Sequence, residues 1–275
     1  MTEYNQTLHL TLVQDSVKLL RILPDESVDL IIADPPYNID IEHWDKYDNY
    51  VEWAKEWIDE VYRVMKNDGN FVLFGGFQFQ NKNGGDLLDL VYYIRKNTKF
   101  RLINVIIWYY KNGITARRFF ANRHEEIVWF AKSKNYIFNL DDVRVKYDKK
   151  TLELYSKDKR LNINNLHKGK NPTNVWEIGR LNSNSKERVG HPTQKPEKLI
   201  QRIVRSMSNK NDIVVDIFAG SGVSTKVCIE EGRNSIACDI DPKLYEYTDA
   251  QVKKIEHLNT FKLYKHISDL NLLFK

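Results

Sequence analysis

Apolar runs alternate with charged and turn-forming stretches over most of the chain, and their spacing predicts strands and helices in turn. Residues 28–33 are apolar and β-branched apart from Asp29, which is typical of a strand buried on both faces of a sheet. From 48 to 65 the apolar positions recur every three to four residues, which predicts an amphipathic helix. The other predicted strands are 8–13, 71–74, 102–110, 126–131, 212–217, 235–238 and 261–265, and the other predicted helices are 16–23, 87–95, 196–207, 223–230 and 242–258.

This regular pattern is interrupted in the middle of the chain. Residues 111–123 form a polar, basic loop, and residues 132–188 are rich in Lys, Asn and Asp, with Val175-Trp176-Glu177-Ile178 as a short apolar stretch. We interpret 132–188 as an inserted region, a small module or a set of long loops. It divides the main domain into the parts 1–131 and 189–275. Strands that alternate with helices on both sides of it predict an α/β fold.

The strand at 28–33 runs into Asp34-Pro35-Pro36-Tyr37. Proline cannot donate to a strand ladder, so the strand ends here. Asp34 should then lie at the carboxyl end of a central parallel strand, where open α/β sheets bind ligands. A carboxylate and a nearby carbonyl can accept both hydrogens of a planar amino group, and Tyr37 offers a ring for stacking. The pattern indicates the exocyclic amine of a flipped nucleobase, although a plain Asp-Pro turn with a packing tyrosine has the same sequence.

A second candidate site follows the predicted strand 212–217. Asp216 precedes Phe218-Ala219-Gly220-Ser221-Gly222, a helix and a strand that ends at Asp239. This order is typical of a nucleotide-binding βαβ unit, in which glycines allow close approach and a later acid binds ribose hydroxyls. The third glycine of a dinucleotide fingerprint and the lysine of a phosphate-binding loop are both missing. An adenosine-type ligand without a pyrophosphate fits best, with a purely structural turn as the alternative.

Composition adds few constraints. The chain has 275 residues, of which 42% are hydrophobic and 29% charged, as in ordinary globular proteins. The net charge of +5 and a pI near 8.9 allow a polyanionic partner. Cys228 and Cys238 stand in apolar surroundings without metal-ligand spacing, so we expect buried thiols and no metal site. A polar N-terminus and the lack of a membrane-length apolar run lead us to expect a cytoplasmic protein.

Together these motifs resemble the DNA amino-methyltransferases that use S-adenosylmethionine. Their order, with Asp34–Tyr37 first, the basic region next and Phe218–Gly222 last, is similar to that of the β-group of bacterial DNA adenine methyltransferases. His191-Pro192-Thr193-Gln194-Lys195-Pro196 matches a further motif of that family. The resemblance covers roughly residues 8–258. It implies a permuted Rossmann-like sheet of seven strands with one antiparallel edge strand, an inserted recognition region, and S-adenosylmethionine as the cofactor.

The resemblance also implies roles for individual residues. Asp34, Pro35, Pro36 and Tyr37 would hold the target base. The residues assigned to the cofactor are Asp15, Thr193, Lys195, Asp216, Phe218, Gly220, Ser221, Gly222 and Asp239. We interpret His191 as a capping or packing histidine instead.

DNA contacts are expected in two basic segments. In the loop, Arg117, Arg118 and Arg123 flank Phe119 and Phe120. The inserted region adds Lys149, Lys150, Lys159 and Arg160, each of which is otherwise a solvated surface charge. The loop 38–49, with Trp44 and Tyr47, is either a lid over the flipped base or a surface loop.

The resemblance implies a site-specific enzyme that methylates the 6-amino group of adenine in double-stranded DNA. A homodimer and a cognate restriction enzyme encoded nearby are both compatible with the resemblance. The 4-amino group of cytosine is the alternative substrate. From other classes, the alternatives are a non-catalytic DNA-binding protein with this fold and a nicotinamide-dependent oxidoreductase, against which the missing third glycine argues.

Overall fold

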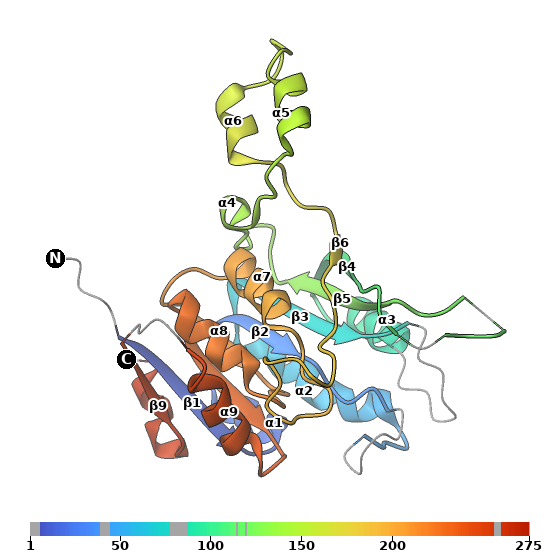
Figure 1. The fold of residues 1–275 in the computed structure, drawn as a ribbon. Helices are drawn as coiled ribbons and strands as arrows, with labels where there is room; N and C mark the ends of the chain where they lie inside the picture. Colours follow the sequence, from blue (N-terminus) through green and yellow to red (C-terminus); the bar gives the residue numbers. More distant parts are fainter. Residues whose placement is uncertain are drawn as a thin grey trace.

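A single mixed sheet forms the centre of the molecule, with helices on both faces (Figure 1). The computed structural model describes residues 6–38, 45–77, 87–113, 115–118, 120–255 and 260–274. Among these residues, nine strands lie in the order β6-β4-β5-β3-β2-β7-β8-β1-β9. The strands are β1 (Thr7–Val13), β2 (Val28–Ala33), β3 (Met65–Gly75), β4 (Arg101–Tyr109), β5 (His124–Ala131), β6 (Val175–Glu177), β7 (Ile213–Asp216), β8 (Asn234–Asp239) and β9 (Phe261–Tyr264).

The helices form two layers because the buried strands present apolar side chains to both faces. On β2 all six residues are buried; Ile31 packs into the core beneath one layer and Ile32 into the core beneath the other. The first layer consists of α1 (Ser16–Ile22), α2 (Tyr50–Val64) and α3 (Leu87–Asn97), and the second of α7 (Glu197–Met207), α8 (Val223–Glu231) and α9 (Leu244–Val252). No helix among the described residues is long and apolar enough to cross a membrane.

The predicted sheet class is confirmed, but two of its details are wrong. The antiparallel strand, β5, does not lie at an edge, because it pairs with both β3 and β4. The sheet also has more than seven strands. The inserted region supplies β6, which pairs with the outer edge of β4 and buries Trp176, and the C-terminal segment supplies β9, which pairs with β1.

Most predicted elements lie within a few residues of the observed ones, with one informative difference after α2. The prediction left residues 66–70 between a helix and a strand, but β3 begins at Met65, directly after the helix. A register shift opposite β2 accommodates the extra residues. A Cβ on Gly69 would stand 3.0 Å from the Asp29 carbonyl oxygen, so the glycine permits this close approach. The predicted helix 242–258 ends at Val252, and residues 256–259 lie outside the described part.

The range 132–188 contains three short helices and β6. The helix α4 (Leu140–Val143) packs near the end of α7, where the Asn139 side chain donates to the Ser208 carbonyl at 2.8 Å. The helices α5 (Lys149–Tyr155) and α6 (Ile163–Lys168) then project from the body (Figure 1). Two backbone hydrogen bonds between Val145 and Lys170, of 3.0 and 2.9 Å, close their base. We call residues 145–170 the projecting hairpin.

Candidate active site at the carboxyl edge of the sheet

The two predicted sites open into one cavity of about 630 Å³. It lies at the carboxyl ends of β1, β2, β7 and β8, together with the amino end of β5, which runs the opposite way. Of the residues predicted for the base and the cofactor, all but Gly222 line it: Asp15, Asp34, Pro35, Pro36, Tyr37, Thr193, Lys195, Asp216, Phe218, Gly220, Ser221 and Asp239. The structure therefore brings together residues that lie more than 200 positions apart in the sequence.

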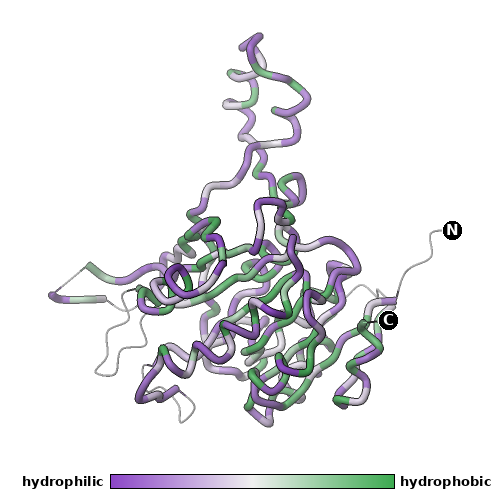
Figure 2. The backbone as a smooth tube through the Cα atoms, turned by 180° about the vertical axis from the view of Figure 1, so that it is seen from behind, coloured by the Kyte–Doolittle hydropathy of each residue, from purple (hydrophilic) through white to green (hydrophobic). Residues whose placement is uncertain are grey.

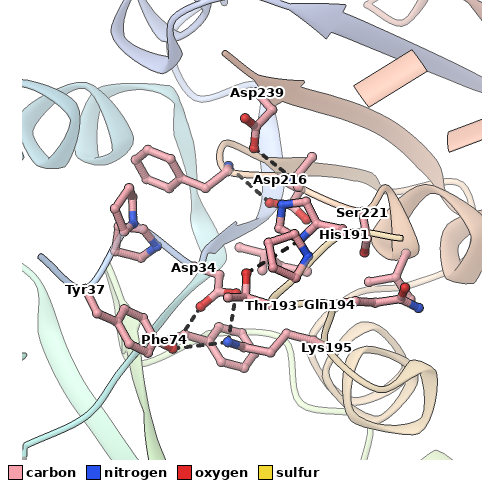
Figure 3. Close-up of a pocket in the computed structure, with 18 of the residues that line it drawn as sticks. Asp34, Tyr37, Phe74, His191, Thr193, Gln194, Lys195, Asp216, Ser221 and Asp239 are labelled. Carbon is pink, nitrogen blue, oxygen red and sulfur yellow. Dashed lines mark hydrogen bonds and ion pairs between the residues drawn. The ribbon is translucent and has the colours of Figure 1, made fainter. Parts of the chain in front are cut away.

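On one side of the cavity, Asp34 is engaged by two protein donors (Figure 3). The Tyr37 hydroxyl donates to Asp34 Oδ1 at 2.9 Å, and the Lys195 ammonium lies 2.9 Å from Oδ2. The resemblance assigned Lys195 to the cofactor, but its charged end points instead to the base motif. Burial and the charges of Asp34 and Glu125 raise the pKa of the Tyr37 hydroxyl, which stays protonated and donates.

The backbone after Asp34 is fixed by side chains of the following segment. The Tyr50 hydroxyl donates to the Pro36 carbonyl at 2.6 Å. Asn38 has a positive φ of 56°, a conformation that Asn tolerates, and its backbone N–H donates to Asp45 Oδ1 at 2.6 Å. These contacts fix the backbone at Pro36 and Asn38, directly after Pro35. Rigid acceptors suit the recognition of a planar amine.

The loop 38–49 is only partly described. Tyr47 stacks on Trp53, with ring centroids 4.1 Å apart, and both rings line the cavity. Tyr47 therefore forms part of a fixed aromatic wall, next to Phe218, whose ring centroid lies 5.8 Å from that of Trp53. Trp44 lies outside the described residues, so the lid remains a prediction.

Three carboxylates occupy the other side of the cavity. Asp239 accepts the Gly220 N–H at 2.8 Å and the Asp241 N–H at 3.0 Å, which orients it at the end of β8. Asp216 accepts the Phe218 N–H at 3.2 Å, and burial raises the pKa of its carboxyl to about 7. Burial also raises the pKa of Asp239. Asp15 caps α1 by accepting the Lys18 N–H at 3.0 Å, beside this group. A cationic ligand would stabilise these carboxylates in their charged forms.

The two glycines of the turn are needed for packing within the protein. Gly220 and Gly222 have φ values of 45° and 70°. A Cβ on Gly220 would stand 2.9 Å from the His191 ring, and one on Gly222 would stand 2.5 Å from Thr248 Oγ1. His191 is buried and packs edge-on against Tyr247, which agrees with its interpretation as a packing histidine. Sequence reasoning had attributed the glycines to close approach of a ligand, and the structure adds this second reason.

The predicted DNA-contact residues fall into two separate groups. Arg117, Arg118 and Arg123 lie in the connection between β4 and β5, at the same end of the sheet as the cavity. Lys149, Lys150, Lys159 and Arg160 lie in the projecting hairpin, which leaves the body near the other end. Phe120 is almost fully exposed, whereas Phe119 lies outside the described residues.

The cavity is also lined by residues that sequence reasoning missed, among them Phe74, Trp108, Glu125 and Arg180. Glu125 is buried at the start of β5, where its carboxylate lies 3.3 Å from the Lys195 ammonium. The available signal was a pair of acids, Glu125 and Glu126, directly before an apolar run. Only knowledge that β5 runs antiparallel places the beginning of that run beside the ends of the parallel strands.

One cavity at the carboxyl edge of a Rossmann-like sheet is thus lined by residues of both predicted motifs, among them Asp34 and Asp216. The profile of the family described as DNA methylase matches residues 28–250, and the chain belongs to that family. The Type II methyltransferase M.HpaI of Haemophilus parainfluenzae is 36% identical over 241 residues, which cover 84% of this chain and 70% of the relative. The DNA adenine methyltransferase YhdJ of Escherichia coli (strain K12) is 34% identical over 253 residues, which cover 88% and 81%.

Solved structures of similar fold agree with this assignment. The PvuII DNA methyltransferase (cytosine-N4-specific) aligns with a TM-score of 0.69 at 19% identity, over 92% of this chain and 90% of that one. The complex of M1.HpyAVI with SAM aligns with a TM-score of 0.62 at 21% identity, over 89% and 98%. At these identities the likeness shows the fold.

Proposed function

We propose that this protein transfers a methyl group from S-adenosylmethionine to the 6-amino group of adenine at a specific sequence in DNA. The observation that carries the proposal is the shared cavity, in which the amine-binding end of Asp34 and the nucleoside-type pocket of Asp216 and Asp239 open toward each other. The relatives support the choice of base, since YhdJ is named a DNA adenine methyltransferase.

The cavity fits the chemistry of this cofactor. Its carboxylates include Asp15, Asp216 and Asp239, two of which have raised pKa values because of burial. S-adenosylmethionine carries a sulfonium and an ammonium group, so it would supply the positive charge that these carboxylates lack. Asp239 is oriented to accept hydrogen bonds from the ribose hydroxyls, and Tyr47, Trp53 and Phe218 line the same cavity. When bound, the cofactor supplies an electrophilic methyl group next to a neutral leaving group.

The protein's own groups prepare the amine. The lone pair of an adenine amine is delocalised into the ring, which makes the nitrogen a poor nucleophile. Hydrogen bonds from its two hydrogens to Asp34 and to the Pro35 carbonyl favour a pyramidal nitrogen and localise that lone pair. Holding the nitrogen in line with the methyl group supplies proximity, and stacking on Tyr37 fixes the plane of the base. The surplus proton leaves after transfer.

We propose different DNA contacts for the two basic regions. Arg117, Arg118 and Arg123 would contact DNA beside the flipped base, because they lie at the cavity end of the sheet. The projecting hairpin would contact phosphates farther along the same duplex. The hairpin contains eight Lys and Arg against three Asp and Glu, so its net charge of +5 equals that of the whole chain. Such charge suits the phosphate backbone.

Relatives that are named Type II methyltransferases support a place in a restriction-modification system, with a cognate restriction enzyme acting on the same sequence. Sedimentation of the protein with and without DNA tests the expected homodimer.

The proposal is tested by expression in a methylation-free host, followed by single-molecule sequencing of the host DNA. The expected result is 6-methyladenine at one recurring sequence. Modification of cytosine instead would select the 4-amino alternative. Unmodified DNA, together with no transfer of labelled methyl groups from S-adenosylmethionine to unmethylated DNA in vitro, would select the non-catalytic alternative.

A further inference from the structure

On the side of the cavity that holds the base motif, Lys195 links two carboxylates, those of Asp34 and Glu125. The Lys195 ammonium lies 2.9 Å from Asp34 Oδ2 and 3.3 Å from Glu125 Oε2. It also donates to the Tyr37 hydroxyl oxygen at 3.2 Å. The lysine side chain is only 11% exposed and that of Glu125 only 9%, so solvent screens these charges little. The ammonium also lies over the rings of Tyr37, Phe74 and Trp108, at 5.2, 5.5 and 5.8 Å from their centroids.

The Tyr37 hydroxyl lies between the same two carboxylates. It is 2.9 Å from Asp34 Oδ1 and 3.2 Å from Glu125 Oε2. In this arrangement each oxygen of Asp34 accepts from a protein group, Oδ1 from Tyr37 and Oδ2 from Lys195. A target amine that bonds to Asp34 must therefore share or take over one of these two places.

We propose that Lys195, anchored by Glu125, is a positioning residue that keeps Asp34 ionised and turned so that Oδ1 receives the target amine in place of the Tyr37 hydroxyl. The inference rests on the proposed function. The lysine keeps its place because it joins two opposite charges, whereas the Tyr37 hydroxyl that donates to the same carboxylate is neutral. The Tyr37 hydroxyl keeps a partner as well, since Glu125 Oε2 is already within reach. The exchange therefore leaves no buried donor unpaired.

The charge between the carboxylates is what makes Asp34 an acceptor. Two like charges that share a buried site raise each other's pKa, and one of them takes up a proton. A protonated Asp34 would donate at one oxygen and would hold the amine poorly. The Lys195 ammonium lies between them, 2.9 Å from Asp34 Oδ2 and 3.3 Å from Glu125 Oε2, and its positive charge offsets this repulsion. Burial opposes the charge of the lysine, but the charges of Asp34 and Glu125 outweigh it and raise the pKa of Lys195.

Other titratable groups lie around Asp34 and Glu125. Each of them is unchanged in the variants below unless the variant replaces that residue. The groups that act on Asp34 or Glu125 from the adjoining elements are Tyr37, Tyr50, Tyr110, His191, Lys195 and Asp216. Because Asp216 and His191 are common to all variants, their influence cancels when pH profiles are compared.

The main test replaces the ammonium by an apolar chain of similar length. For Lys195→Met we expect the single-turnover rate of methyl transfer to fall about 100-fold, the loss typical of a misplaced reacting group. Calorimetry should show the affinity for S-adenosylmethionine within about twofold of the wild type. The acid limb of the pH–rate profile should move to higher pH, because Asp34 now shares its site with Glu125 without a cation. Lys195→Arg keeps the charge, so its acid limb should stay in place.

A matched control lies outside the cavity. Lys226 is equally buried, with 7% of its side chain exposed, and it also joins two carboxylates, those of Glu197 and Glu230. Lys226→Met should lose stability but keep the wild-type rate per folded molecule and its pH profile. This control separates the loss of a buried ion pair as such from the loss of this particular pair.

A double variant makes the charge argument sharper. In Lys195→Met/Glu125→Gln the like charge next to Asp34 is gone together with the cation. Its acid limb should therefore return toward that of the wild type, and its rate should exceed that of Lys195→Met.

Two results would overturn the inference. One is a Lys195→Met protein with the wild-type rate and an unmoved acid limb. The other is a Lys195→Met/Glu125→Gln protein whose acid limb lies at the same pH as that of Lys195→Met. Should Lys195→Met not fold, Lys195→Gln takes its place, since its amide donates to Asp34 without a charge and the same shift is expected. Asp34→Ala separates the role of Lys195 from the proposed function of the base motif. If this variant stays active, the proposed function of the base motif fails as well.

Discussion

The cavity and the projecting hairpin show two ways in which this chain uses charged residues. In the cavity, charged groups are buried and held by partners far away in the sequence, such as Tyr37 and Lys195, 158 positions apart. In the hairpin, no residue of α5 is buried, and only Leu166 of α6 is. Arg160 there pairs with Asp158, only two positions away. Figure 2 shows the same contrast, with apolar strands in the body and many hydrophilic positions along the hairpin.

The difference lies in what each region can do. Low exposure makes each charge in the cavity costly unless it is matched, so position and protonation are tightly coupled there. Exposed ion pairs contribute little to stability, and the hairpin charges remain available for a polyanion. Under the proposed function the cavity would carry out the chemistry, and the hairpin would attract DNA without regard to its sequence.

The largest expected effect comes from the cavity. Asp34→Ala should lower methyl transfer by about 10²–10³-fold, the loss found when one preorganised hydrogen-bonding group is removed from a transition state. Binding of S-adenosylmethionine should stay nearly unchanged, because the side chain stands at a strand end outside the core. Single-turnover assays and calorimetry on the same preparation measure both quantities. Full activity in this variant would show that the amine is held elsewhere.

The next effect concerns the cofactor side. Asp239→Ala should weaken binding of S-adenosylmethionine, since each charge-assisted bond to a ribose hydroxyl is worth about 1.5–3 kcal/mol. The loss also frees the Gly220 N–H, which Asp239 holds at 2.8 Å. Gly220→Val should abolish binding, because even a Cβ there meets the His191 ring at 2.9 Å. Calorimetry that finds wild-type affinity in both variants would remove the cofactor assignment.

A smaller effect should appear as a pH dependence of cofactor binding. The pKa of Asp216 is raised to about 7 by burial, and a bound cation favours its charged form, so a proton leaves when the cofactor binds. Affinity should therefore be low below pH 7, rise about tenfold between pH 6 and pH 8, and level off above. Calorimetry in buffers with different ionisation enthalpies counts the released protons. Asp216→Asn is the control, in which this rise should disappear.

The smallest effect is expected in the hairpin. Replacing Lys149, Lys150, Lys159 and Arg160 by Ala should leave the rate at saturating DNA unchanged. On long duplexes the log–log salt slope of binding should shrink by about 0.9 for each lost phosphate contact. Short duplexes centred on the target should bind as before, whereas Arg117→Ala/Arg118→Ala should weaken both. A hairpin variant that methylates a different sequence would contradict this division, because the hairpin would then read bases.

Much of the fold follows from periodicity. The apolar run at 28–33 specifies β2, since a strand buried on both faces needs apolar side chains at every position. The prediction failed where a segment pairs with a distant edge. Nothing local in Val175–Glu177 indicates that it extends the sheet next to β4, and β5 could not be placed inside the sheet before the strand order was known.

The sequence by itself determined the two motifs and the family, because Asp34–Tyr37 and Phe218–Gly222 are local in the chain and each carries its own chemistry. It also determined the caps of the hairpin, in which Asp148 accepts the Thr151 N–H at 2.9 Å. Only the tertiary structure decided the partners of Asp34. The reversed direction of β5 delivers Glu125 to the cavity, and the segment before α7 delivers Lys195. Interactions between buried charges depend on distance in space, which sequence separation does not reveal.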